Sequence, residues 1–131
     1  MNVLALEGAT MRLLLAVVAM LPVTVSGAFA DSDPNADFHK ADKALNETFR
    51  QIEKRLADDT SGKARLIAAQ KAWIAFRDAE CTFQSSGEDG GTAAPMVATS
   101  CRATLTEDRT RQLKAYLHCQ EGDLACPVPA Q

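Results

Sequence analysis

Residues 62–83 read GKARLIAAQKAWIAFRDAECTF, a stretch in which apolar residues recur at steps of three and four. That spacing places side chains on one face of an α-helix. The expected apolar stripe consists of Leu66, Ala69, Trp73, Phe76 and Phe83, widened by Ile67, Ile74 and Cys81. A face this broad needs two neighbouring elements to cover it. We therefore expect a helix that begins near Ser61 or Gly62 and packs against two others.

A similar pattern precedes this stretch and predicts a helix over about residues 35–58. Its apolar face consists of Phe38, Ala41, Leu45, Phe49, Ile52 and Leu56. Asp33 or Asn35 is suited to cap this helix. Pro34 is suited to its first turn, because the missing N–H would have no partner there. Residues 58–62, DDTSG, predict the stop before the next helix.

A third helical pattern runs from Pro95 to about His118. Its apolar positions are Val97, Cys101, Leu105, Leu113, Tyr116 and Leu117. The loop before it, residues 85–92, reads SSGEDGGT, and its glycines supply the turn conformations that end a helix. After Cys119, a glycine and two prolines predict a short irregular tail. Short connections make neighbouring helices antiparallel, so the predicted fold class is all-α, a small three-helix up-down-up bundle.

The composition agrees with one helical domain and excludes several classes of protein. The chain has 131 residues, of which 47% are hydrophobic and 24% charged, as in ordinary globular proteins. Aromatic residues make up 5%, which is too few for an all-β sandwich. The formal net charge of −3 is opposite in sign to a nucleic-acid-binding footprint, so we expect no nucleic-acid partner.

The first 30 residues have the features of a secretory signal peptide. Arg12 precedes the apolar run of residues 13–25, and Ala28-Phe29-Ala30 has the small-x-small form of a cleavage site. The run is too short for a transmembrane helix and is interrupted by Pro22. We expect residues 1–30 to be removed and the mature chain to begin at Asp31.

Cleavage there leaves residues 31–131 as a single helical domain with a short C-terminal tail, whether translation starts at Met1 or at Met11. No cysteine near the cleavage site is available to accept a lipid, and no later stretch is apolar enough to span a bilayer stably. We therefore expect a periplasmic or secreted protein.

All four cysteines lie in this exported part, and an even number after an export signal predicts disulfides. They form no C-x-x-C pair, so we expect no zinc site, and the sequence indicates no other cofactor. Cys81 ends one helix and Cys101 begins the next, which brings them close in an antiparallel pair. Their bond is the preferred one, with Cys119 bonded to Cys126 in the tail. Other pairings remain open, since a bundle end can also bring Cys119 near another cysteine.

Two groups of residues resemble the motifs of a known family. Residues 40–49, KADKALNETF, contain Ala-Asp, then Leu-Asn and an aromatic residue. The second group is Gln70-x-x-Trp73-x-x-x-Arg77-Asp78-x-x-Cys81, Gly90-Gly91, Cys101 and Thr106-x-x-Arg109. Together they resemble the LprI-like lysozyme-inhibitor domain over about residues 35–117. The resemblance implies a small, helical, exported bacterial domain, with lysozyme inhibition reported for the family's namesake.

The chain also departs from that namesake. It lacks the cysteine that would accept a lipid, so the resemblance does not extend to a membrane anchor. Cys119 and Cys126 are additions to the cysteine pair that the family shares.

The motif residues have a structural interpretation beside a binding one. One helical stripe contains Gln70, Trp73, Arg77 and Cys81. We favour Trp73 as an anchor of the core, with Arg77 paired to a carboxylate. The candidate carboxylates are Glu80, Asp42 and Asp108. Asn46 lies inside a helix, where it is unfavourable by propensity, so we expect it to form a hydrogen bond across the bundle or to face solvent.

Catalytic groups are not apparent. Asp78 and Glu80 are two residues apart on a helix and point to different sides, unlike the paired carboxylates of glycosidases, so we expect solvated or ion-paired charges. His39 and His118 have no Ser or Cys nucleophile in a recognisable setting. Gly90-Gly91 lacks the lysine and the spacing of a phosphate-binding loop. We therefore expect a protein that is not an enzyme.

The glycine-rich loop is the candidate contact surface for a partner. Glu88 and Asp89 precede Gly90 and Gly91, and the bond between Cys81 and Cys101 would hold this acidic protrusion in place. For the loop taken by itself, we favour a solvated connector over a contact surface.

For the whole protein we favour a non-catalytic inhibitor of lysozyme or a related cationic cell-wall hydrolase, since opposite charge speeds encounter. The alternatives are an envelope interaction or stress-resistance module with another partner and, third, a small hydrolase.

Overall fold

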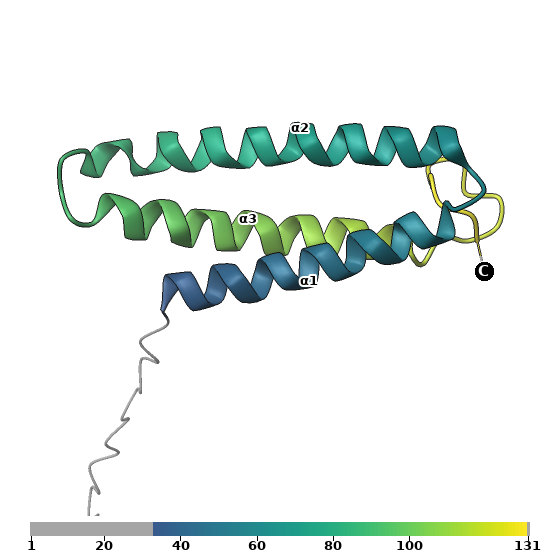
Figure 1. The fold of residues 1–131 in the computed structure, drawn as a ribbon, viewed down its shortest axis with the longest axis horizontal. Helices are drawn as coiled ribbons and strands as arrows, with labels where there is room; N and C mark the ends of the chain where they lie inside the picture. The colour runs from purple at the N-terminus through teal and green to yellow at the C-terminus, as the bar shows by residue number, and fades with distance from the viewer. Residues whose placement is uncertain (1–32, 131) are drawn as a thin grey trace, which may run out of the picture. The chain divides into compact units, whose positions relative to one another are not determined.

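The computed structural model describes residues 33–130, which form three α-helices that alternate in direction (Figure 1). Helix α1 spans Pro34–Arg55, α2 spans Thr60–Ser85 and α3 spans Ala94–Tyr116, and a 3-10 turn, η1, spans Ser86–Glu88. The predicted all-α, up-down-up bundle is confirmed. The predicted signal peptide and its cleavage site lie outside the described residues.

Capping side chains define where the helices begin. The Asp33 carboxylate accepts a backbone N–H at 3.0 Å, which makes Asp33 the cap of α1. At the start of α2, Asp59 Oδ1 accepts the Gly62 N–H at 2.8 Å. A Cβ at position 62 would lie 2.3 Å from Asp59 Oδ2, so glycine leaves room for this cap. Helix α1 ends at Arg55 rather than at Asp58, because the chain there changes to turn-type hydrogen bonds.

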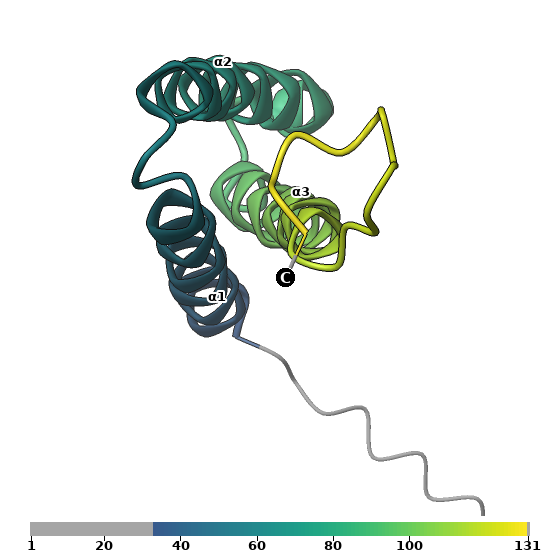
Figure 2. The ribbon, with the colours of Figure 1, turned by 90° about the vertical axis from the view of Figure 1, so that its right-hand side faces the viewer.

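Helix α3 is the element against which the other two pack (Figure 2). Helix α1 packs most extensively against α3, and α2 packs against α3 along a narrower strip. The buried core consists of Leu45, Ile52, Leu56, Leu113 and Val128. No helix within residues 33–130 is both long enough and apolar enough to cross a bilayer.

The C-terminal tail folds back onto the helices (Figure 2). Val128 is 3% exposed and belongs to the core. The Arg55 guanidinium donates to the carbonyl oxygens of Leu117 and Pro129, and Cys119 is bonded to Cys126. The tail is irregular, as predicted, but it closes one end of the bundle.

The predicted apolar stripe of α2 is confirmed only in part. Leu66 and Trp73 pack against the core and Cys81 is buried, but the other buried residues of the helix are Gln70, Arg77 and Ser85. Phe76 is 55% exposed and Phe83 is 74% exposed. Because the disulfide at Cys81 and the contacts of Arg77 face α3, they determine which side of α2 is covered. Helix α2 has one extensive neighbour rather than the two expected, so most of its apolar surface stays exposed.

Candidate functional site

The loop that joins α2 to α3 lies at one end of the bundle (Figure 1). The Asp89 N–H donates to Ser86 O at 3.3 Å, and the Gly91 N–H donates to Glu88 O at 2.9 Å. Gly90 has a φ of 81°, in the left-handed region that favours glycine. The four residues predicted as a contact surface are all exposed: Glu88, Asp89, Gly90 and Gly91. We call residues 86–93 the acidic loop.

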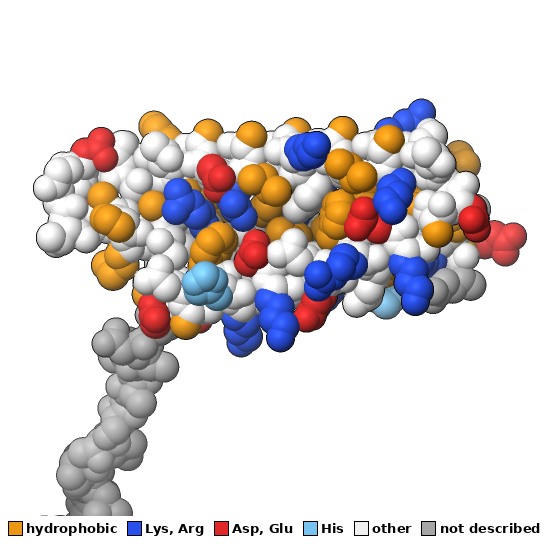
Figure 3. All heavy atoms as spheres, viewed as in Figure 1, with side chains coloured by type: hydrophobic (Ala, Val, Ile, Leu, Met, Phe, Trp, Pro, Cys, Tyr) orange, Lys and Arg blue, Asp and Glu red, His pale blue; other side chains and the backbone are white. Residues whose placement is uncertain are grey.

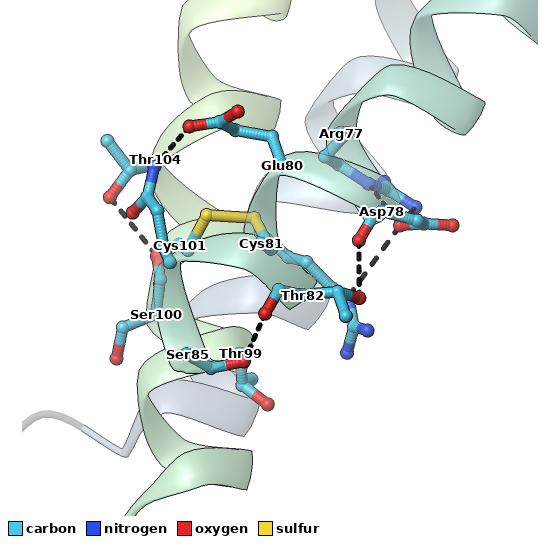
Figure 4. The surroundings of a disulfide bond; sticks show 12 residues. Arg77, Asp78, Glu80, Cys81, Thr82, Ser85, Thr99, Ser100, Cys101 and Thr104 are labelled. Carbon is cyan, nitrogen blue, oxygen red and sulfur yellow. Dashed lines mark hydrogen bonds and ion pairs between the residues drawn. A yellow bond between two sulfur atoms is a disulfide. The ribbon is translucent and has the colours of Figure 1, made fainter. Parts of the chain in front are cut away.

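A disulfide between Cys81 and Cys101 closes the base of the acidic loop (Figure 4). The two Cα atoms are 5.5 Å apart, and Cys81 is fully buried. Ser85 Oγ donates to Thr82 O at 3.1 Å and so adds a bond in the last turn of α2. The predicted pairing is confirmed here and for the tail cysteines, so the helices on either side of the loop are covalently linked.

The loop end of the bundle carries negative formal charge. Residues 79–101 contain no lysine or arginine, and their acidic residues are Glu80, Glu88 and Asp89. At the other end of the bundle, α1 has Lys54 and Arg55 in its last turn. Asp58, Asp59, Glu121 and Asp123 accompany them there, so the loop end differs from the other end in lacking basic residues over 79–101.

The motif residues meet one another where α2 packs against α3, away from the acidic loop. The Arg77 Cζ atom lies 5.3 Å from the centre of the Trp73 ring and 5.3 Å from that of Phe38 in α1. The Arg109 Cζ atom, from α3, lies 5.9 Å from the same Trp73 ring. Such contacts each stabilise by about 0.5–2 kcal/mol, depending on how far they are desolvated. Trp73 therefore links two cationic side chains from two helices.

Arg77 is 8% exposed, and its guanidinium is neutralised by the next residue along the helix. The Nη2 atom lies 2.9 Å from Asp78 Oδ1, and Nη1 donates to Thr106 Oγ1 at 3.4 Å. The three carboxylates predicted as partners are wrong: Glu80, Asp42 and Asp108 bond elsewhere. Asp78 is adjacent to Arg77 in the sequence, whereas spacing rules for helices pair residues three or four positions apart.

Arg109 is bonded in the same region. Its Nε atom donates to Gln70 Oε1 at 3.1 Å, and its Nη1 atom donates to Gln112. Burial lowers the pKa of the Arg109 guanidinium, and its interaction with Tyr116 offsets part of that shift. No buried side-chain N or O atom in the described part of the chain lacks a hydrogen-bond partner. We call Trp73, Arg77, Arg109, Gln70 and Thr106 the arginine–tryptophan cluster, and its contacts are those of a helix-to-helix joint.

The other candidate residues either bond within their own helix or are exposed to solvent. Asn46 is exposed, and its Nδ2 atom donates to Asp42 Oδ2 at 2.9 Å within α1, so it forms no bond across the bundle. Asp78 is ion-paired, as expected, and Glu80 accepts a hydrogen bond from Gln84. His39 and His118 are both exposed. Among residues 33–130, no three His, Cys, Asp or Glu side chains are placed to hold a metal ion.

Two contacts of this architecture were not foreseen. Phe38 was placed in the apolar stripe of α1, but its ring lies beside Arg77. Val128, in the tail, is buried although its surroundings in the sequence are rich in proline and polar residues. Both depend on which helices become neighbours, and local spacing carries no signal for that.

Comparisons with known proteins agree with the motif. The sequence profile of the family described as "Lysozyme inhibitor LprI" matches residues 34–113. An uncharacterized protein of Rhizobium meliloti is 34% identical over 97 residues, which cover 66% of this chain and 70% of that protein. The uncharacterized protein YecT of Escherichia coli is 33% identical over 88 residues, covering 60% of this chain and 54% of YecT. No solved structure matches.

Proposed function

The chain belongs to the LprI lysozyme inhibitor family, and we propose that it is an exported protein that binds and inhibits a lysozyme-type cell-wall hydrolase. The observation that carries the proposal is the acidic loop: an exposed, negatively charged protrusion whose two flanking helices are joined by a disulfide. The proposed inhibitor acts by occupying the hydrolase and catalyses no reaction itself.

Charge supports this choice of partner. A cationic hydrolase approaches the loop end of the bundle, where residues 79–101 present acidic side chains and no basic ones. Complementary charge of this kind raises the association rate and weakens as salt screens it. In the proposed complex, Glu88 and Asp89 contact the basic rim of the hydrolase's substrate cleft.

The construction of the loop supports the same mode of binding. Binding costs less free energy when the contacting segment is already held in one conformation. The Cys81–Cys101 bond and the two turn hydrogen bonds reduce the freedom of the loop before any partner arrives. The glycines at positions 90 and 91 offer backbone groups without side chains, which can approach a cleft lined by carboxylates.

The arginine–tryptophan cluster is a less suitable contact surface. Its guanidinium and amide groups are already bonded within the chain, and Arg77 is buried. A partner that bound there would have to compete with these contacts within the chain. We therefore assign the motif residues to the framework that holds the loop.

Inhibition is tested by lysis of a suspension of bacterial cell walls, followed by turbidity. Lysozyme activity should fall in proportion to added protein and reach a minimum near equimolar amounts, as a stoichiometric binder requires. Full activity at a large molar excess would refute the proposal. Binding without inhibition would instead support an envelope module with another partner, which a pull-down from an envelope extract would identify.

Export is tested separately by mass spectrometry of the protein recovered outside the cytoplasm. The proposed signal peptide predicts a mass that starts at Asp31. A recovered chain that retains residues 13–25 would refute cleavage there without affecting the proposal of inhibition.

A further inference from the structure

Helix α2 has an apolar face on the side away from α3. Two aromatic rings are exposed on it, Phe76 by 55% and Phe83 by 74%. Exposed alanines lie between and beside them: Ala68, Ala72, Ala75 and Ala79. In Figure 3, hydrophobic side chains are spaced along the upper edge of the molecule, over α2. Within residues 33–130, α2 packs against α3 and η1, and these lie elsewhere on its surface. We call these six residues the outer face of α2.

We propose that the outer face of α2 binds the same face of a second copy of this chain, forming an antiparallel dimer. The four alanines are separated by steps of four, three and four, so their order is the same in both directions. A twofold axis between positions 73 and 74 places Ala72 against the partner's Ala75, and Ala68 against the partner's Ala79. A twofold interface requires such self-complementarity. Alanine also lets two helix axes approach to about 8 Å.

The charges at the edges of this face fit the same register. Lys71 and Asp78 are seven residues apart, or two helical turns, and therefore lie along one edge of the outer face. Lys71 is exposed, and the Asp78 side chain is 46% exposed although it is ion-paired with Arg77 and, at 3.6 Å, with Arg102 of α3. In the antiparallel register each Lys71 lies within about 3 Å along the axis of the partner's Asp78, and this pair occurs twice.

The other edge is complementary as well. The exposed Arg65 of each copy comes level with the partner's Phe83, whose ring offers a face to the guanidinium. Because one register satisfies the alanines, the ion pairs and the aromatic rings together, a second copy is the occupant that the surface favours. Another protein would need to reproduce this pattern by coincidence.

The size of the contact sets its strength. The outer face runs from Ala68 to Phe83, about 22 Å of helix, and two such faces would bury roughly 800 Å² in total. Specific stable interfaces bury more than about 1,200 Å², so we expect a weak, transient dimer that dissociates on dilution. The antiparallel arrangement places the two acidic loops at opposite ends, where both stay accessible. The inference therefore does not depend on the proposed inhibition.

Sedimentation velocity over a concentration series tests the proposal on the purified exported protein. The mass should rise from monomer towards dimer as the concentration reaches hundreds of micromolar. Ala75→Glu, which places two carboxylates in the centre of the contact, should weaken the dimer at least tenfold. The matched control is Ala36→Glu, the same exchange at an exposed position of α1, which should dimerise like the parent. Circular dichroism checks that both variants keep the helix content of the parent.

A second variant and a cross-link test the register. Lys71→Glu should weaken the dimer several-fold at low salt, whereas Lys43→Glu, at an exposed position of α1, should not. Carbodiimide treatment of a mixture of isotope-labelled and unlabelled chains should join Lys71 of one copy to Asp78 of the other. The proposal is overturned if the parent stays monomeric at all concentrations, or if Ala75→Glu dimerises as the parent does. Dimers cross-linked only through other residues would overturn the antiparallel register.

Discussion

The Arg77 guanidinium lies 5.3 Å from the centre of the Trp73 ring, one helical turn away on α2, and Arg109 of α3 approaches the same ring. Trp73, Arg77 and Arg109 of the motif therefore connect α2 to α3. Since Arg77 is buried and bonded to Asp78 and Thr106, the joint has one well-defined arrangement. This joint holds α2, the helix that leads into the acidic loop, against α3.

The hydrogen bond from Arg109 to Gln70 should contribute to that joint. Gln70→Met keeps the length of the side chain but removes the acceptor, so Arg109 loses a partner in a half-buried site. We expect a loss of about 1–2 kcal/mol in the free energy of unfolding, measured with urea. Gln112→Met is the matched control, because Gln112 also accepts from Arg109 but is exposed, and water can replace it. Equal losses in the two variants would contradict the assignment.

The acidic loop should govern the rate at which the inhibitor binds. Replacing Glu88 and Asp89 together by Ala should slow association with lysozyme several-fold at low salt while leaving the helix content and stability unchanged. Surface plasmon resonance at several salt concentrations measures this effect, which should diminish as salt rises. The control is Asp58→Ala with Glu121→Ala, an equal charge change at exposed positions away from the loop. If both double variants associate at the parent rate, the loop is not the contact surface.

The two disulfides should differ in their contribution to stability. In the chain-entropy treatment, the bond that spans 20 residues contributes about 3 kcal/mol and the bond that spans 7 residues about 2 kcal/mol. Replacing Cys81 and Cys101 by Ala should therefore lower the melting temperature more than replacing Cys119 and Cys126 does. Thermal unfolding followed by circular dichroism compares the variants. If removal of the Cys119–Cys126 bond lowered the melting temperature more, the tail bond would stabilise the bundle by more than its ring size predicts.

The tail should stabilise the bundle through one side chain. Val128→Ala removes two methyl groups from the core and should cost about 2 kcal/mol of unfolding free energy. Leu124→Ala, in the same tail at a fully exposed position, should change stability by less than about 0.5 kcal/mol. Urea unfolding of both variants makes the comparison. A loss for Leu124→Ala as large as that for Val128→Ala would show that the tail acts without specific packing.

Much of this architecture could be predicted from the sequence because its causes are local. Helical spacing, the Asp33 cap and the glycines of the loop each act within a few residues, so the helices were found close to their true bounds. The pairing of Cys81 with Cys101 followed from an antiparallel connection. The exposure of the acidic loop followed from its polar and glycine-rich composition.

The side of α2 that is buried could not be predicted from apolar spacing. Phe76 and Phe83 were expected inside, yet Gln70 and Arg77 are buried in their place. A buried arginine is favourable only when its charge and its N–H groups are satisfied. Trp73 and Asp78 on the same helix supply part of this, but Phe38 and Thr106 come from helices far away in the sequence. The burial of Val128 has the same kind of cause, because it depends on the tail returning to a bundle already assembled.

The disulfide at the base of the acidic loop also affects how the molecule withstands proteases. Proteases cut preferentially at exposed loop tips. Residues 82–100 contain no lysine or arginine, so enzymes that cleave after basic residues find no site there. A cut by any other protease would open the loop but leave α2 and α3 covalently attached through Cys81 and Cys101. Separation of the pieces would require reduction as well as cleavage, so a single nick leaves the helices together.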